Sequence, residues 1–286
     1  MISWYFSALA ALVLMGIQRF FYKVAAEKKY PTEWVTFSFM ATVTVLSAGL
    51  YFYQQRQEPD IAYLLAVSFV NSAAFLVATV SHIEALKYIP ANIAYSIIRL
   101  NVVLVAVFSI FYFKEHISLF QGLGLVAAVA AMIALTTQMG ADTTKPKQRR
   151  RGTVFILLAL LGGATASVSS KFAAMHGDNL AFMALSYLMG MIGSLGITRA
   201  LSYDTAKENR LPALGLGIVM GGFNFAGFYA FLYALERGPL SLIASIVGMH
   251  FVIAIVLSAI IYREKIKPVG FLGILLTIMS IILIRL

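Results

Sequence analysis

The chain has 286 residues, of which 60% are hydrophobic and only 12% are charged, and its mean hydropathy is +0.86. A soluble domain usually carries about 25% charged residues, so the composition excludes a soluble globular protein and predicts one that crosses a membrane several times. The net charge of +10 would suggest nucleic-acid binding in a soluble protein, but basic cytoplasmic loops explain it better in a membrane protein. The chain has no cysteine, which excludes disulfides and thiolate metal sites.

Ten apolar segments follow one another along the chain, each near the length of about 20 residues that crosses a bilayer core. We expect membrane helices at 3–22, 33–53, 62–83, 90–113, 119–138, 153–170, 180–200, 212–235, 239–262 and 268–285. The first apolar run has no basic region before it, and Gln18 and Arg19 follow it where a signal peptide would have small residues. We therefore expect a first membrane helix and not a removable signal.

An internal duplication organises these helices. Residues 85–124 and 234–273 align without a gap at a constant offset of 149 and share twelve identities in forty positions. The identities that carry most weight are a proline, a glutamate and a glycine in each copy: Pro90, Pro239, Glu115, Glu264, Gly124 and Gly273. We expect three parts, namely a first five-helix repeat at 1–139, a basic cytoplasmic linker at 140–151 and a second five-helix repeat at 152–286.

The orientation of the two repeats follows from the helix count. Five is odd, so the second repeat enters the membrane from the side opposite to the first, which gives an inverted 5+5 repeat. The fold class we predict is therefore an all-α membrane protein with ten transmembrane helices. Fifteen Lys and Arg residues lie in loops after odd-numbered helices and five after even-numbered ones, which places the linker in the cytoplasm and both termini outside.

Arg99 is the strongest candidate for a functional side chain. It lies nine residues after Pro90 and therefore about 14 Å along a helix, near the midplane of the membrane. A central arginine costs about 2.5–3.5 kcal/mol on insertion scales and does not lose its proton. We expect it to face a wet cavity or a partner; a structural pairing with a carbonyl or a tyrosine is the alternative.

Further polar residues lie at membrane depth. At the offset of 149, Asn101 matches His250, and Arg99 matches Gly248, so one repeat leaves room where the other places a long cation. The histidine is equally well explained by titration near neutral pH or by a hydrogen bond between helices. The candidate substrate-binding residues are Arg99, Asn101, His250, Asn71, Asn224 and Gln18.

Plainer roles compete for some of these residues. Asn71 and Asn224 lie near mid-membrane, and amides there often only bridge helices. Arg19 is four residues before Lys23, so we expect its side chain to reach the membrane interface.

All twelve acidic residues fall at predicted helix ends or in loops. An exporter that trades protons for cations usually needs a carboxylate in the middle of the membrane, and this chain has none there. Because the charge predicted at the midplane is positive, we expect an anionic or zwitterionic substrate that Arg99 holds with the help of backbone and amide groups.

The ten-helix count, the inverted repeat and the basic residue followed by glutamate before each last helix resemble the drug/metabolite transporter superfamily, with EamA-type members most similar. Lys114-Glu115 and Arg263-Glu264 stand where that family has its repeated signature. The resemblance implies a central cavity lined by helices 1, 3, 4, 6, 8 and 9, alternating access, and a monomer. Many members have a proline in the fourth and ninth helices near where this chain has Val102 and Phe251, so the resemblance leaves open whether these helices bend there. It also implies cytoplasmic termini, against the charge count.

The leading hypothesis is a secondary transporter, an exporter of a small anionic or zwitterionic metabolite such as an amino acid or organic acid. Multidrug efflux of lipophilic compounds is the alternative within transport. A non-transporting membrane scaffold and a membrane-embedded enzyme are alternatives from other classes, although the HExxH and GxSxG motifs are absent. We expect no cofactor and no metal. The expected partners are a small-molecule substrate, a coupling proton and the lipid bilayer of the cell (inner) membrane, with no nucleic acid.

Overall fold

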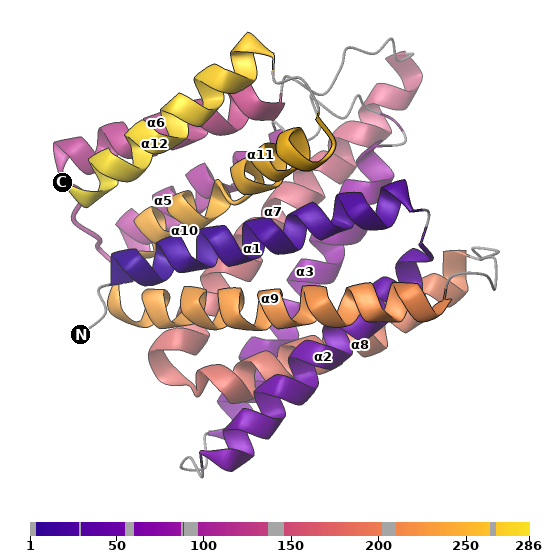
Figure 1. Cartoon of the computed structure of the whole chain (residues 1–286). Coiled ribbons are helices and arrows are strands. Elements are labelled where there is room, and N and C mark those ends of the chain that lie inside the picture. The colour runs from indigo at the N-terminus through magenta and orange to yellow at the C-terminus, as the bar shows by residue number, and fades with distance from the viewer. Residues whose placement is uncertain are drawn as a thin grey trace.

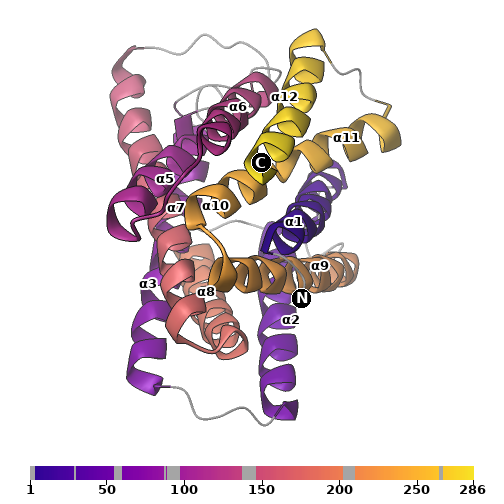
Figure 2. The ribbon, with the colours of Figure 1, turned by 90° about the vertical axis from the view of Figure 1, so that its left-hand side faces the viewer.

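The computed structural model describes residues 4–28, 30–54, 60–86, 88, 97–136, 146–201, 210–263 and 267–286, and this part of the chain is helical without any strand. Its helices lie side by side in one bundle (Figures 1 and 2). The first half holds α1 (Trp4–Glu27), α2 (Thr32–Tyr53), α3 (Ile61–Leu86), α5 (Asn101–Tyr112) and α6 (Leu119–Thr136). The second half holds α7 (Pro146–His176), α8 (Asn179–Leu201), α9 (Arg210–Arg237), α10 (Leu240–Gly248), α11 (Phe251–Ile261) and α12 (Pro268–Arg285).

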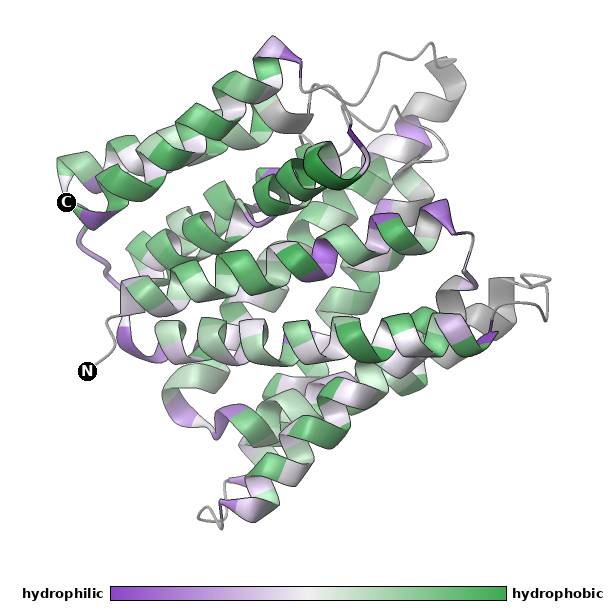
Figure 3. Cartoon of the chain, in the orientation of Figure 1, coloured by the Kyte–Doolittle hydropathy of each residue, from purple (hydrophilic) through white to green (hydrophobic). Residues whose placement is uncertain are grey.

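Seven segments of the described helices are long and apolar enough to cross a membrane, and three shorter apolar helices lie at Ile97–Tyr112, Leu119–Ala134 and Asn179–Gly193. Hydrophobic residues make up most of the length of the helices, while many of the hydrophilic ones lie at the helix ends (Figure 3). The protein is thus an all-helical, multi-pass membrane protein. One predicted boundary moves: α7 begins at Pro146, so the last six residues of the predicted linker are helical.

The two helices predicted at 90–113 and 239–262 are each interrupted, which corrects the expectation that both are continuous. In the second half, α10 ends at Gly248, and α11 begins at Phe251 after a turn of two residues. In the first half, residues 97–99 are helical, Leu100 is in a turn, and α5 begins at Asn101. Leu100 and Met249 are equivalent at the offset of 149, so both repeats break at the same place.

Neither interruption contains a proline. A local change in the backbone hydrogen bonds accounts for both interruptions. Around the second break, the backbone nitrogens of Met249, His250 and Val252 donate to carbonyls three residues earlier. Around the first, the nitrogens of Leu100 and Val103 do the same. Where the backbone hydrogen bonds span three residues instead of four, the turn becomes tighter and the helix axis changes direction.

A tight turn follows α5 and α11 in the same way. Lys114 has φ of 53° and Arg263 has φ of 54°, a left-handed conformation that disfavours residues with a side chain. These residues are equivalent at the offset of 149 and immediately precede the repeated glutamate. Glu264 itself lies outside the described residues. The two repeats therefore share a backbone conformation as well as sequence.

Buried polar contacts close one end of the bundle. The Lys171 Nζ on α7 donates to the carbonyls of Leu235, at 2.5 Å, and Gly238, at 2.8 Å, where α9 leads into α10. The Glu115 carboxylate accepts from the backbone nitrogens of Leu240 at 2.6 Å and Ser241 at 3.1 Å, and from the Ser241 hydroxyl at 2.5 Å. A carboxylate from the first repeat thus caps the N-terminus of α10 in the second.

Helix α12 of the second half contacts α6 and α1 of the first half. The Ser280 hydroxyl on α12 donates to the Gly124 carbonyl on α6 at 2.7 Å, and the Tyr5 hydroxyl on α1 donates to the Ile281 carbonyl at 2.9 Å. A Cβ at Gly124 would lie 2.8 Å from the Ile284 side chain, so α6 and α12 approach closely. The ends of the chain lie at the same end of the bundle, where α10 also begins (Figure 1).

Candidate functional site

The two helix interruptions meet inside the bundle. The Arg99 guanidinium, from the break in the first repeat, lies over the ring of Phe251 at the start of α11, 4.8 Å from its centroid. A Cβ at Gly248 would lie 3.1 Å from the Val102 side chain. The equivalent breaks of the two repeats are therefore packed against each other, and side chains of Val102 and Met132 occupy the space beside Gly248 that the sequence comparison predicts to be open.

His250, in the break before α11, has a buried ring nitrogen without a hydrogen-bond partner. Its side chain is 6% exposed, its Nδ1 lies 2.7 Å from the Val247 carbonyl, and its buried Nε2 has no hydrogen-bond partner. The His250 carbonyl faces α1, where a Cβ at Gly16 would lie 2.5 Å from it. A buried nitrogen without a partner is unusual and can receive a ligand atom.

Asn101 and Gln18 are placed differently relative to the breaks. Asn101 begins α5 at the first break, and its amide packs on Gly163 of α7, where an added Cβ would lie 2.6 Å from its Nδ2. Gln18 is buried on α1, two residues after Gly16. Residues two apart on a helix face different sides, so the contact of Gly16 with the second break does not extend to Gln18.

Asn71 and Asn224 hold helices together instead. The Asn71 amide donates to the Ala166 carbonyl at 2.8 Å and to the hydroxyls of Ser169 and Ser170 at 2.9 and 3.1 Å, which joins α3 to α7. Asn224 accepts a hydrogen bond of 2.5 Å from the Tyr187 hydroxyl, which joins α9 to α8. Their hydrogen bonds match the bridging role that competed with substrate binding for both amides.

The site residues predicted from the sequence did not include Phe251, on which Arg99 lies. No pattern within one segment reveals a contact between the two repeats. Arg19 is exposed on α1, and its guanidinium lies over Tyr22, 5.4 Å from the ring centroid. Helix α1 continues to Glu27, so Arg19 lies about 12 Å before the helix end, and its reach to the membrane interface stays a prediction.

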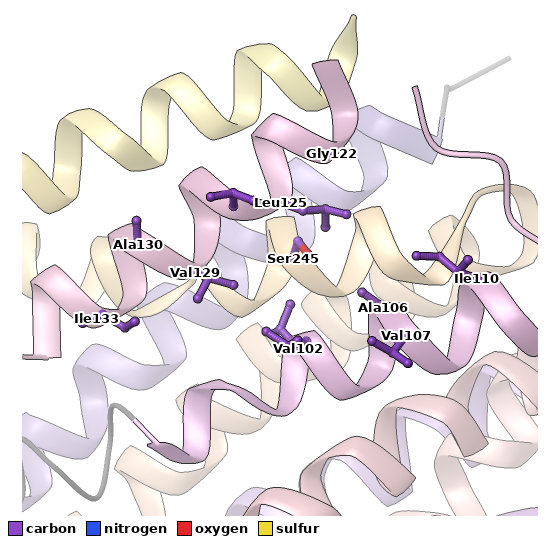
Figure 4. A pocket seen from close by; sticks show the side chains of 12 residues that line it. Val102, Ala106, Val107, Ile110, Gly122, Leu125, Val129, Ala130, Ile133 and Ser245 are labelled. Carbon is purple, nitrogen blue, oxygen red and sulfur yellow. The ribbon is translucent and has the colours of Figure 1, made fainter. Parts of the chain in front are cut away.

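An apolar groove of about 480 Å³ lies between α5 and α6, with Ser245 of α10 at its base (Figure 4). Several lining side chains, such as Val107 and Val126, are exposed at the surface of the bundle. The groove opens toward the surroundings of the bundle, and the polar residues near the breaks do not line it. The described residues contain no group of three His, Cys, Asp or Glu side chains that could hold a metal ion.

Known proteins show which family has this architecture. The model of the EamA-like transporter family matches residues 2–137 and 150–286, one match to each repeat. One solved crystal structure of a protein is similar to this chain, with a TM-score of 0.79 at 15% sequence identity. That match covers 100% of this chain and 99% of the other, which shows a shared fold. No curated protein matches the chain. Since the family model covers both halves almost completely, this chain belongs to the EamA-like transporter family.

Proposed function

We propose that the chain is a secondary transporter that exports a small anionic or zwitterionic metabolite, such as an amino acid or organic acid, by alternating access. The substrate anion binds at the meeting point of the two helix interruptions. Arg99 is its main anchor, His250 and Asn101 add polar contacts, and Gln18 is a further candidate from α1. Asn71 and Asn224 support the surrounding helices.

One observation carries this proposal, namely the position of Arg99 over Phe251, whose neighbour in the chain, His250, has a buried Nε2 without a hydrogen-bond partner. Helix interruptions at equivalent places in an inverted repeat are typical of transporter binding sites. The guanidinium of Arg99 lies at these interruptions, and a fixed planar cation suits a carboxylate or phosphate.

We propose further that the seven long and three shorter apolar segments make ten spans. An even number agrees with chain ends at one end of the bundle (Figure 1). By the charge count, that end faces outside, and the linker faces the cytoplasm of a cell with an inner membrane. The closed end built by Lys171 and Glu115 would then face outside, so the site would load from the cytoplasm. We expect a monomer and a proton as the first coupling ion to test.

Transport by purified protein in proteoliposomes tests the proposal. The panel contains labelled amino acids, mono- and dicarboxylates, phosphate esters and lipophilic cations, each measured with and without a proton gradient. We expect anions or zwitterions to move and the cations to stay. Transport of lipophilic cations alone would replace the proposal with multidrug efflux.

Arg99→Ala should reduce transport of the identified substrate at least 100-fold, because the loss of a charge-assisted contact in a dry site costs about 3 kcal/mol. Arg237→Ala is the matched control. Arg237 also lies on a helix, but it is exposed and pairs with Glu236 at 2.7 Å at the end of α9, so we expect no loss of transport. Substantial transport by Arg99→Ala, with normal membrane insertion, would remove its assigned role.

A reporter that is active only in the cytoplasm tests the orientation. Fused after Leu286, it should stay silent, whereas insertion into the linker should give signal. The reverse pattern would place the termini in the cytoplasm and leave the substrate proposal intact.

A further inference from the structure

The groove between α5 and α6 separates two helices that follow each other in the chain. Helices adjacent in sequence usually pack together, but α5 packs on α10 and α7, and α6 packs on α12 and α10. Side chains of α5 and α6 form the two walls, and Ser245 of α10 lies between them (Figure 4). The groove volume of about 480 Å³ is typical of pockets that hold a small molecule.

The walls of this groove are apolar. Apart from Ser245, the lining residues are Val, Ala, Ile, Leu and Gly, and the Ser245 hydroxyl already donates to the Ser241 carbonyl at 2.8 Å. Val107 on α5 and Val126 on α6 are exposed on the outside of the bundle, where a membrane protein meets hydrocarbon. The groove therefore suits an aliphatic chain from the bilayer and not a polar molecule.

The length of the groove matches one leaflet of a bilayer. Its residues on α5 extend from Val102 to Ile110, and those on α6 from Gly122 to Ile133. At a rise of about 1.5 Å per residue, these stretches are about 12 and 16 Å long. Half of a hydrocarbon core of about 30 Å is about 15 Å. A single acyl chain can therefore lie along the whole groove.

A basic residue stands at the end of the groove where a lipid headgroup would lie. Ile110 and Gly122 are at the end next to the loop 113–118, which joins α5 to α6. Lys114 is in this loop and is exposed. A lysine at the end of a membrane helix extends its side chain to the interface, where it attracts anionic headgroups. The groove and Lys114 thus complement the two parts of one phospholipid.

We propose that the groove between α5 and α6 binds one phospholipid of the surrounding bilayer, with an acyl chain along the groove and the phosphate at Lys114. An anionic phospholipid binds more tightly there than a zwitterionic one. The proposal does not depend on the proposed function, because the groove is separate from the substrate site. Val102 connects the two regions, since it lines the groove and also lies beside Gly248 at the second break. A bound acyl chain therefore supports the packing of the two breaks from the outside.

Native mass spectrometry tests lipid binding directly. The whole chain, purified and delipidated in detergent, is titrated with dioleoylphosphatidylglycerol and with dioleoylphosphatidylcholine. The two lipids have the same acyl chains and differ in the charge of the headgroup. We expect the first bound phosphatidylglycerol to have an affinity about 5-fold higher than that of phosphatidylcholine, which is the effect of one basic side chain near the headgroup.

A variant that narrows the groove tests the acyl-chain position. Gly122 lines the groove, and a Cβ there would meet nothing within 4 Å. We expect Gly122→Leu to weaken the binding of both lipids about 10-fold, because one or two methylene groups of the acyl chain lose their contacts. Gly49→Leu on α2 is the matched control. A Cβ at Gly49 would also meet nothing within 4 Å, but this residue does not line the groove, so both affinities should stay unchanged.

A second pair of variants tests the headgroup position. Lys114→Gln should remove the preference for phosphatidylglycerol and leave the affinity for phosphatidylcholine unchanged. Arg263→Gln is the control, because Arg263 is the equivalent residue of the second repeat. It is also exposed and has the same left-handed backbone, with φ of 54° against 53°, but it follows α11 at the other end of the bundle. Its substitution should change neither affinity.

Two results would overturn the proposal. Equal lipid binding by Gly122→Leu and by the unchanged chain would show that the acyl chain lies elsewhere. A dimer that Gly122→Leu converts to a monomer would show that a second copy of the chain occupies the groove. Loss of the headgroup preference in Arg263→Gln but not in Lys114→Gln would likewise contradict the assigned position of the phosphate.

Discussion

The two ends of the bundle each hold a lysine over an aromatic ring, yet the two lysines are buried to different extents. At the end that holds the chain termini, Lys171 lies over Phe113 at 5.9 Å, is buried, and donates to two carbonyls. At the other end, Lys23 lies over Tyr262 at 5.1 Å and is half-buried. Phe113 and Tyr262 are equivalent at the offset of 149, and both lysines stand near the ends of their helices.

The ninth predicted helix shows the same contrast along its own length. Eight of the nine residues of α10 are buried, whereas α11, described in full, buries only Val252 and Ser258. One repeated frame thus supports a more buried end and a less buried end in the same molecule. The difference teaches that a repeated sequence does not require equal burial at the two ends. Under alternating access, the opposite state would exchange the two packings.

The largest test of this contrast is removal of the two lysines. Lys171→Met should lower the free energy of unfolding by about 3 kcal/mol, because two carbonyls lose a charged donor in a buried site. Lys23→Met should cost far less. Thermal unfolding of the purified variants in detergent measures the difference, and equal losses for the two lysines would show that the ends are equally sealed.

Gly16 tests the contact between α1 and the break in the ninth helix. Gly16→Ala should destabilise the protein by about 2 kcal/mol, because the new methyl group would meet the His250 carbonyl and the Ile253 Cβ, each at 2.5 Å. Gly49→Ala on α2 is the control, since a Cβ there meets nothing within 4 Å, and it should leave stability equal or higher. The same unfolding assay compares them, and a tolerated Gly16→Ala would mean that α1 moves freely against the break.

A substitution at Glu115 has the smallest expected effect on stability. Glu115→Gln keeps the size of the side chain but weakens the cap on α10, so we expect a loss of about 1 kcal/mol. Glu236→Gln serves as control, because its exposed pair with Arg237 contributes little. Faster proteolysis near Leu240 in Glu115→Gln, with no change in Glu236→Gln, would locate the loosening. Equal behaviour of the two variants would show that Glu115 does not seal this end.

The helix spans could be predicted from the sequence, because about 20 consecutive apolar residues have few alternatives in a bilayer. The interruptions at Leu100 and Met249 could not, because hydropathy averages over a whole span and neither turn contains a proline. The sequence contained only weak signals for these interruptions. Gly248 precedes Met249, and a polar residue follows each turn at equivalent positions, namely Asn101 and His250.

The site prediction was based on depth in the membrane, and depth does not show partners. Arg99 lies beside the second repeat, over Phe251, and the count of residues from Pro90 could not show this contact. Helix α1 extends five residues beyond its predicted end at residue 22, because a sequence pattern places helix ends only to within a few residues. The bridging role of Asn71 depends on Ser169 and Ser170 of another helix, and no spacing within α3 could reveal these partners.

The contacts of α12 have a consequence for how the protein is made. Ser280 bonds to Gly124 and Ile281 to Tyr5, so helices from the first half receive partners that the ribosome delivers much later. Until then, α1 and α6 lie in the lipid without these contacts. Completion of the fold is therefore a late event of biosynthesis, and nascent chains that lack α12 should be recognised by membrane quality control as unassembled.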